Sequence, residues 1–186
     1  MTVSYKYRFF APYVKYFTSR EYVSFLLEQL GGRGKIGNFR YAPLIGPDIF
    51  SGILVKATGR SVLAFADEVL FGPLDIHVNG SIAFKNKEEQ MAINETAGIN
   101  GWVTDPTGIH TAGWGLFLTA SDMTKIGQLY LNGGVWKGRC LVSEEWIKDS
   151  TREHSRWKSG ICHMATYGGL MRTAMQPWET AAIQFV

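Results

Sequence analysis

The stretch from Asp105 to Gly138 constrains this chain most, because its centre carries the signals of both ends of a helix. Thr119 and Asp122 have the spacing of a capping box, in which two side chains bond each other's backbone N–H groups at a helix start. Gly133-Gly134 follows the last apolar residue, where glycine commonly ends a helix. Between these ends, apolar residues recur at helical spacing, at Met123, Ile126, Leu129 and Tyr130. The sequence therefore predicts a capped helix with one buried face.

A bend and a short apolar run precede this helix. Gly113-Trp114-Gly115 places a large aromatic residue between two glycines, which suits a tight bend that delivers Trp114 onto a core. The apolar run from Leu116 to Leu118 follows. The order of bend, apolar run, capped helix and glycine turn resembles the segment G-x-G-L-x-x-T-x-x-D-M-x-K-x-G-x-L-Y-L-N-x-G-x-W-x-G of the serine hydrolases of the β-lactamase family. These are the class C β-lactamase-like and penicillin-binding-protein-like enzymes.

Caps and apolar spacing predict further helices. Thr18 with Glu21 forms a second capping box, and Ser61 and Ser143 stand where N-cap residues are expected. Residues 1 to 17 are rich in aromatic side chains, contain Pro12, and are predicted to be extended or irregular. The additional helices are expected from about Ser19 to Leu30, from Gly46 to Gly59, from Ser61 to Phe71, from Asn86 to about Asn94, and from Glu144 to about Asp149.

A second signature region of the same family is resembled by the stretch that starts at Phe39, FRYAPLIGPDIFSGILVKATGRSVLAFADEVLFGPLDI. In that family the tyrosine of a Y-x-N or Y-x-S motif lies in the active site and helps to move the proton of the nucleophilic serine. Tyr41 matches this tyrosine, so the resemblance implies a catalytic acid/base role for it. The third position of the motif is Pro43, which has no side-chain donor or acceptor for a substrate amide. The alternative is that Tyr41 is a half-buried aromatic residue whose hydroxyl donates a hydrogen bond to a neighbouring carbonyl.

No convincing nucleophile accompanies Tyr41. An acyl-serine enzyme of this type needs S-x-x-K at the start of a buried helix upstream of the tyrosine. Here that spacing occurs at Ser155-Arg156-Trp157-Lys158, downstream and in a polar stretch where relatives carry H-S-R-W, so Ser155 is interpreted as structural or incidental. The string His110-Thr111-Ala112-Gly113 suggests the family's H-T-G or K-T-G motif only superficially, because that motif belongs near the end of the family chain. There is no G-x-S-x-G elbow.

The composition of the chain limits the kinds of binding partner that can be expected. The 186 residues suffice for one domain with a real core, and 46% hydrophobic content indicates a globular chain. The net charge of +3 is scattered along the chain, so no nucleic-acid or membrane surface is implied, and no apolar run reaches membrane-spanning length. Neither the two cysteines nor the four histidines have the spacing of a metal site, and no cofactor is expected. The compartment stays open, because the sequence has no recognisable signal peptide and its start looks internal to the family's full-length sequence.

The tail from about Ser159 departs from the pattern, with neither helix caps nor alternation. Relatives continue there as a strand carrying Y-G-Y-L-W-W. Cys162 to Val186 can be encoded by one choice of synonymous codons that has a second meaning in another reading frame. When the first two bases of that DNA are dropped, it translates to PYGYLWWVNADGYAAMGDGGNTIC. This string resembles the expected continuation of the family, with G-D-G-G at the third-motif region. The hypothesis is a frame change near Ser159-Gly160 that produced an out-of-frame tail; a disordered end is the alternative.

The resemblance implies a fold class and a parent activity. The fold is expected to be the mainly helical part of an α/β β-lactamase/transpeptidase-like fold, a helical lobe with an incomplete antiparallel sheet. Residues 1–157 would form this partial domain, and residues 158–186 the aberrant tail. The parent would hydrolyse a β-lactam, a D-Ala-D-Ala peptide or a small ester through an acyl-serine, and this chain alone is expected to be inactive. Exposed apolar faces would favour self-association. The alternatives are a non-catalytic binding or structural module and a truncated product without selected function.

Overall fold

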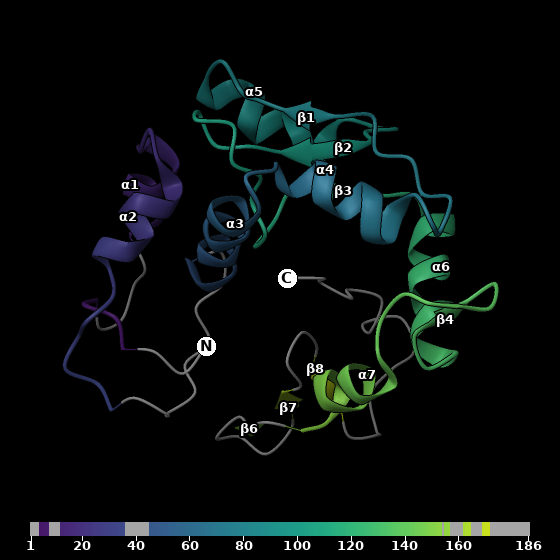
Figure 1. Ribbon diagram of the computed structural model, residues 1–186. Coiled ribbons are helices and arrows are strands. Elements are labelled where there is room, and N and C mark those ends of the chain that lie inside the picture. Colours follow the sequence, from purple (N-terminus) through teal and green to yellow (C-terminus); the bar gives the residue numbers. More distant parts are fainter. Residues whose placement is uncertain are drawn as a thin grey trace. The chain divides into compact units, whose positions relative to one another are not determined.

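The computed structural model describes residues 4–7, 12–35, 45–153, 155–156, 162–164 and 169–171. Figure 1 shows its helices and strands, with labels where there is room. The chain divides into two compact units, Met1–Asp122 and Met123–Val186. The predicted division between residues 157 and 158 stays a prediction, because both positions lie outside the described residues.

The first unit begins with two short helices, α1 (Tyr13–Thr18) and α2 (Tyr22–Glu28). Helix α1 lies in the stretch predicted to be extended or irregular, so that prediction is wrong there. The Thr18–Glu21 capping box is also wrong, because the Thr18 hydroxyl donates to the Val14 carbonyl at 2.8 Å and so closes the last turn of α1. Helix α2 starts after Glu21, which makes no side-chain cap bond. The predicted helix from about Ser19 to Leu30 therefore starts three residues too early and ends two residues too late.

Helix α3 (Ile45–Thr58) begins and ends as the sequence predicts. Pro47 lies in its first turn, where a missing N–H is tolerated, and Gly59 follows its end with φ of +67°. The helix packs against α2, and Gly52 permits the approach because a Cβ there would lie 2.5 Å from Val23 Cγ1. Its mid-helix glycine is thus explained by close packing.

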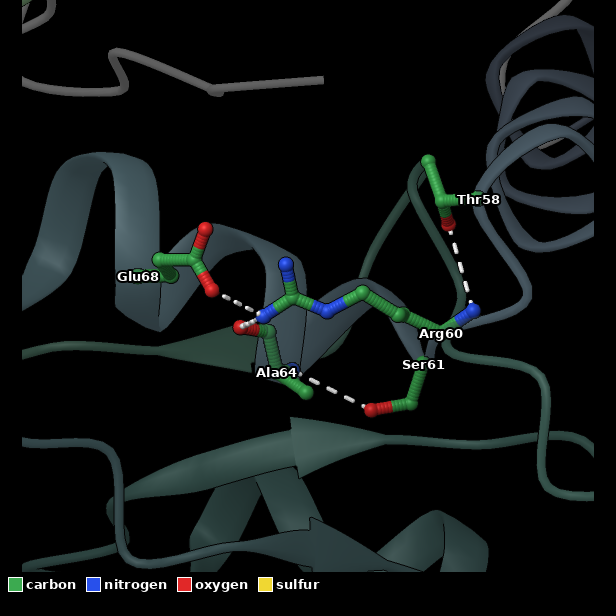
Figure 2. Close-up of polar contacts among 5 residues, drawn as sticks. All are labelled: Thr58, Arg60, Ser61, Ala64 and Glu68. Carbon is green, nitrogen blue, oxygen red and sulfur yellow. Dashed lines mark hydrogen bonds and ion pairs between the residues drawn. The ribbon is translucent and has the colours of Figure 1, made fainter.

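Figure 2 shows the connection from α3 to α4 (Val62–Ala66). The Ser61 hydroxyl accepts from the Ala64 N–H at 3.1 Å, which confirms Ser61 as the N-cap. Arg60 reaches along α4, donating to the Ala64 carbonyl at 3.0 Å and pairing with Glu68 at 2.6 Å. The π-helix η1 (Asp67–Phe71) continues α4 to the predicted end at Phe71.

A small mixed sheet follows in the first unit. Its strand order is β1 (Ser81–Ile82), β2 (Gly101–Val103), β3 (Leu116–Phe117), with β1 parallel and β3 antiparallel to β2. Between β1 and β2 lie α5 (Lys87–Ala92) and the 3-10 turn η2 (Ile93–Glu95). The Asn86 side chain caps α5 by accepting from the Glu89 N–H at 2.8 Å, so the predicted acidic helix is confirmed.

Trp114 lies where the glycine bend predicts, against the aromatic side chains of the first unit. Its ring lies 5.5 Å from that of Phe17 between centroids, edge to face. Only Gly115 of the two flanking glycines has positive φ, at +79°, and a Cβ there would lie 2.6 Å from Val103 Cβ. The core beneath Trp114 is formed by Tyr5, Tyr16, Tyr22, Leu26 and Ile49.

Helix α6 (Ala120–Leu131) is the predicted central helix, and its capping box is confirmed. The Asp122 N–H donates to Thr119 Oγ1 at 3.1 Å, and Asp122 Oδ2 accepts from the Thr119 N–H at 3.2 Å. Gly133 and Gly134 then take φ of +61° and +85°, as the glycine turn predicts.

The second unit continues with a hairpin, a helix and a small sheet. Strands β4 (Val135–Trp136) and β5 (Arg139–Cys140) pair antiparallel. Helix α7 (Glu144–Thr151) is capped by the Ser143 hydroxyl, which accepts from the Trp146 N–H at 3.1 Å, as predicted. Strands β6 (Ser155–Arg156), β7 (Cys162–Met164) and β8 (Gly169–Met171) form an antiparallel sheet in that order. Strands therefore occur in a tail whose sequence shows no alternation, and residues 172–186 lie outside the described residues.

Helices thus predominate among the described residues, together with small mixed sheets. This agrees with the helical character expected of the fold. No helix in the described ranges is by itself long and apolar enough to cross a membrane; the segments Gly46–Thr58 and Val62–Phe71 reach that measure only together, and they are bent by 77°.

Candidate functional site

The predicted catalytic residue, Tyr41, lies outside the described residues, as does Pro43. Its acid/base role therefore stays a prediction. Ser155, the first residue of the S-x-x-K spacing, lies in strand β6. A nucleophile of that motif should instead open a helix, so that the lysine one turn later can reach the serine. The backbone at Ser155 thus favours the interpretation of Ser155 as structural or incidental.

A buried polar cluster is centred on Asp48, in the first turn of α3. We call it the Asp48 cluster, and it consists of Tyr16, Asp48, Ala112, Gly113 and Trp114. Asp48 Oδ1 accepts the backbone N–H groups of Ala112 and Gly113, each at 2.7 Å. Asp48 Oδ2 accepts the hydroxyl of Tyr16, whose oxygen accepts the indole N–H of Trp114 at 3.1 Å. Both carboxylate oxygens of Asp48 are therefore occupied.

Burial sets the protonation behaviour of this cluster. Asp48 is 2% exposed, and desolvation raises the pKa of its carboxyl, while the bonds from Tyr16, Gly113 and Ala112 oppose that rise. Desolvation and the neighbouring Asp48 carboxyl raise the pKa of the Tyr16 hydroxyl far above its ordinary value. Tyr16 accordingly stays a neutral hydrogen-bond donor and is unsuited to serve as a base.

Asp105 is the second fully buried carboxylate, and it links a loop to helix α2. Its Oδ1 accepts from the N–H groups of Thr107 and Ile109, both at 2.9 Å, which closes the turn after β2. Its Oδ2 accepts from the Tyr22 N–H at 3.1 Å. Asp105 therefore satisfies a donor in the first turn of α2, where a negative charge also complements the helix dipole.

Together, these two carboxylates are structural. Each accepts backbone N–H groups from its own loop or from a distant one, and within the described part of the chain neither pairs with an amine or imidazole that it could activate. Their effect is to fix α1, α2, α3 and the loop 105–115 of the first unit to one another.

A different pair has the chemistry of a nucleophile and a base. Ser81 Oγ lies 3.0 Å from His110 Nε2, within hydrogen-bonding distance. Ser81 is exposed at the start of β1, whereas His110 is 2% exposed. The pairing of β1 with β2 places Ser81 opposite Trp102, and an isolated bridge joins Thr104 to His110. Backbone pairing across β2 thus brings the two side chains together.

Aromatic packing holds the imidazole of His110 in place. The Trp102 ring lies edge to face with it at 5.5 Å between centroids, and the Trp102 indole N–H donates to the Thr111 carbonyl at 2.6 Å. His110 Nδ1 is buried and has no hydrogen-bond partner within the described part of the chain. Burial lowers the pKa of His110, so the ring is neutral at pH 7 and its free nitrogen lone pair can accept a proton.

Sequence patterns do not predict this pair. Ser81 and His110 are 29 residues apart. The spacing matches no short motif, and their contact depends on a parallel strand pairing two residues long. A weak signal exists in retrospect, because Gly80 precedes Ser81 and takes φ of +137°, which lets the chain turn into an edge strand. For metals, no group of three or more His, Cys, Asp and Glu side chains within the described ranges could hold an ion.

Comparison with known proteins points to a hydrolase. No family model matches the chain. The 6-aminohexanoate-dimer hydrolase of Paenarthrobacter ureafaciens is 26% identical over 130 residues, which are 70% of this chain and 28% of that protein. This chain therefore spans less than a third of the length of the relative it matches. The relative is a hydrolase of the β-lactamase/transpeptidase-like superfamily, so the match agrees with the resemblance carried by the central helix and supports a general hydrolase origin.

Proposed function

We propose that this chain is part of a serine hydrolase of the β-lactamase family and does not hydrolyse substrate as it stands. The observation that carries the proposal is the 26% identity, over 130 residues, to a hydrolase. The capped helix α6 and the bend at Trp114 support it, because both form as the family-like segment requires. The proposed reaction of the parent protein is hydrolysis of a β-lactam, a D-Ala-D-Ala peptide or a small ester.

The parent's chemistry would proceed through an acyl-enzyme. A serine hydroxyl attacks the substrate carbonyl, a nearby base takes its proton, and backbone N–H groups stabilise the oxyanion. Tyr41 is proposed to take part in this proton transfer. The sequence contains no S-x-x-K upstream of Tyr41, so the serine and lysine would have to come from a segment that the printed sequence does not contain.

Self-association is proposed as the chain's own behaviour in solution. Large apolar side chains are exposed on α3 and α6, among them Phe50 at 47%, Ile53 at 56% and Leu131 at 83%. Such side chains favour contacts between copies when they gather in patches. Small-molecule or peptide substrates would be the parent's partners, and neither nucleic acid nor membrane is proposed.

A chimera tests the proposed function. Residues 1–157, carrying Ser81→Ala so that the Ser81–His110 pair cannot react, would replace the matching part of the 6-aminohexanoate-dimer hydrolase, which would supply the rest of the fold. We expect the chimera to react covalently with an active-serine fluorophosphonate, and Tyr41→Phe to slow the reaction about a hundredfold, the usual effect of losing a general acid/base. Tyr130→Phe in α6 is the matched control and should leave the rate unchanged. A folded chimera that never reacts, or one indifferent to Tyr41→Phe, would contradict the proposal.

The isolated chain tests the second half of the proposal. Incubation with a fluorescent penicillin, followed by denaturing electrophoresis, should show no covalent band. A covalent band would reveal a nucleophile and overturn the expected inactivity toward β-lactams. Reversible binding without covalent labelling would instead favour the alternative, a non-catalytic binding module.

A further inference from the structure

We propose that Ser81 and His110 form a nucleophile–base pair that reacts with small activated esters and with phosphonylating agents. The pair is independent of Tyr41, and the inference does not rest on the proposed function. It follows from three features of the first unit: the 3.0 Å contact between Ser81 Oγ and His110 Nε2, the exposure of Ser81 and the burial of the imidazole.

The access that a nucleophile needs is provided by the place of Ser81 in the sheet. Strand β1 is an outer strand in the order β1-β2-β3, and Ser81 is its first residue. The side chain is exposed, so a small reagent can approach Oγ from solvent. A serine hydroxyl that only filled a core position would not have this access.

The base is supplied by a ring with a fixed position. Trp102 packs against His110 edge to face, and the bridge between Thr104 and His110 fixes the backbone. In the tautomer with the proton on Nδ1, the lone pair of Nε2 accepts the hydrogen of Ser81 Oγ, whereas in the other tautomer Nε2–H donates to Ser81 Oγ. Burial lowers the pKa of His110, which keeps the ring neutral at pH 7, the state that a general base requires, and also makes it a weaker base than a solvated imidazole.

The reaction is balanced within this pair and an ester. Ser81 Oγ attacks the acyl carbon, His110 Nε2 takes the hydroxyl proton, and an Oγ–carbon bond forms. The bond between the acyl carbon and the leaving oxygen then breaks, its electron pair stays on that oxygen, and the imidazolium returns the proton to it. Hydrolysis of the acyl-serine by a water that the same nitrogen deprotonates is expected to be slow, so the acyl group stays on Ser81. With a fluorophosphonate, the Oγ–phosphorus bond replaces the phosphorus–fluorine bond, fluoride leaves and the proton passes to His110.

The surroundings of His110 Nδ1 set the expected rate of reaction. In serine triads a carboxylate bonded to Nδ1–H holds the imidazole in the reactive tautomer, and its loss lowers kcat by about 10⁴. His110 Nδ1 lacks such a partner among the described residues, so both tautomers are accessible. We therefore expect slow, stoichiometric modification of Ser81 by activated reagents, without efficient turnover of ordinary esters.

Labelling with a fluorophosphonate, followed by peptide mapping, tests the pair. Modification is expected at Ser81 in the wild-type chain, and Ser81→Ala should abolish it. His110→Gln should slow it about a hundredfold, the usual contribution of a general base. Two controls should leave it unchanged: Ser121→Ala removes another exposed serine, and His77→Gln removes an exposed histidine. Labelling that maps elsewhere, or that persists unchanged in His110→Gln, would overturn the proposal.

A thiol variant tests the same geometry where His110→Gln proves unstable. Ser81→Cys should place a thiol beside the imidazole, and its reaction with iodoacetamide at pH 7 should exceed that of the exposed free thiol Cys140 about tenfold, since a neighbouring histidine favours the thiolate. Equal reaction of the two thiols in a folded variant would show that His110 does not act on position 81. Neither experiment involves Tyr41 or a β-lactam, so failure here leaves the chimera test unaffected.

Discussion

Asp48 accepts three hydrogen bonds from two backbone N–H groups and one hydroxyl group. The N–H groups of Ala112 and Gly113 point at Oδ1, and the Tyr16 hydroxyl points at Oδ2. A buried donor that loses its acceptor destabilises the folded state by about 1–3 kcal/mol. Asp48 therefore determines the stability of the first unit more than a single exposed carboxylate would.

Asp48→Ala should lower the free energy of unfolding by roughly 3–5 kcal/mol, because it leaves several donors unpaired at once. Asp48→Asn should recover most of that loss, since its amide oxygen still accepts both N–H groups and its NH₂ can donate to the Tyr16 oxygen. Urea titration followed by tryptophan fluorescence measures both changes. Asp67→Ala, at an exposed carboxylate, is the control and should change stability by less than about 0.5 kcal/mol. A similar loss in Asp48→Ala and Asp67→Ala would contradict the role given to Asp48.

The pH dependence of stability should also change at Asp48. Burial raises its pKa in the folded state above the unfolded value of about 3.9. Between the unfolded-state and folded-state pKa values, the folded chain binds more protons at this carboxyl than the unfolded chain does. The contribution of Asp48 protonation to stability is therefore full below about pH 4 and is lost as pH rises through the folded-state pKa. Unfolding free energies of the wild type and Asp48→Asn, measured across this range, should diverge with rising pH in favour of the variant. A constant difference would mean that the pKa of Asp48 is not raised.

Among the elements, α6 has the most complete local start signal. Thr119→Ala removes the hydroxyl that accepts from the Asp122 N–H and donates to Asp122 Oδ2 at 2.7 Å. The loss of an N-cap destabilises a helix by about 1 kcal/mol. Thr119→Ser keeps the hydroxyl and should stay within a few tenths of a kcal/mol of the wild type. Chemical denaturation compares the two variants, and equal losses would show that the hydroxyl does not cap the helix.

The glycine turn after α6 offers a matched pair. A Cβ at Gly134 would lie 1.9 Å from the Val142 carbonyl oxygen, whereas at Gly133 the nearest atom would be Glu144 Cγ at 3.6 Å. Both residues have positive φ, so Gly133→Ala should cost about 1–2 kcal/mol from backbone strain alone. Gly134→Ala should cost at least about 2 kcal/mol more, because the backbone must move. Thermal melting would rank them, and the reverse order would be evidence against this turn geometry.

Local signals account for the elements that the sequence predicts correctly. Ser61, Thr119 and Ser143 each accept from an N–H three residues ahead, so these caps can be predicted from neighbouring residues. The start of α2 was misplaced because the Tyr22 N–H is satisfied by Asp105, 83 residues away. The Ser81–His110 pair was missed for the same reason, since only the sheet brings it together. Features that depend on tertiary contacts between distant residues therefore cannot be predicted from the local pattern of a single sequence.

For the whole molecule, the origin of the tail is the central question. The frame-change hypothesis predicts that the encoding DNA, read in another frame past the codons for Ser159-Gly160, contains Y-G-Y-L-W-W. It also predicts an S-x-x-K coding segment upstream of the present start. Sequencing the gene with about five hundred bases on either side tests both expectations. Stop codons without these strings would contradict the hypothesis, and the tail would then be native sequence.

The hydrogen bonds at Asp48 also have a consequence for the order of folding events. They join residues 32, 64 and 65 positions apart. Closing loops of this length costs entropy before any contact compensates for it, so these bonds form after the local helices. Interactions made after the folding transition state act mainly on the unfolding rate. Asp48 should therefore prolong the lifetime of the folded first unit while leaving the speed at which it folds nearly unchanged.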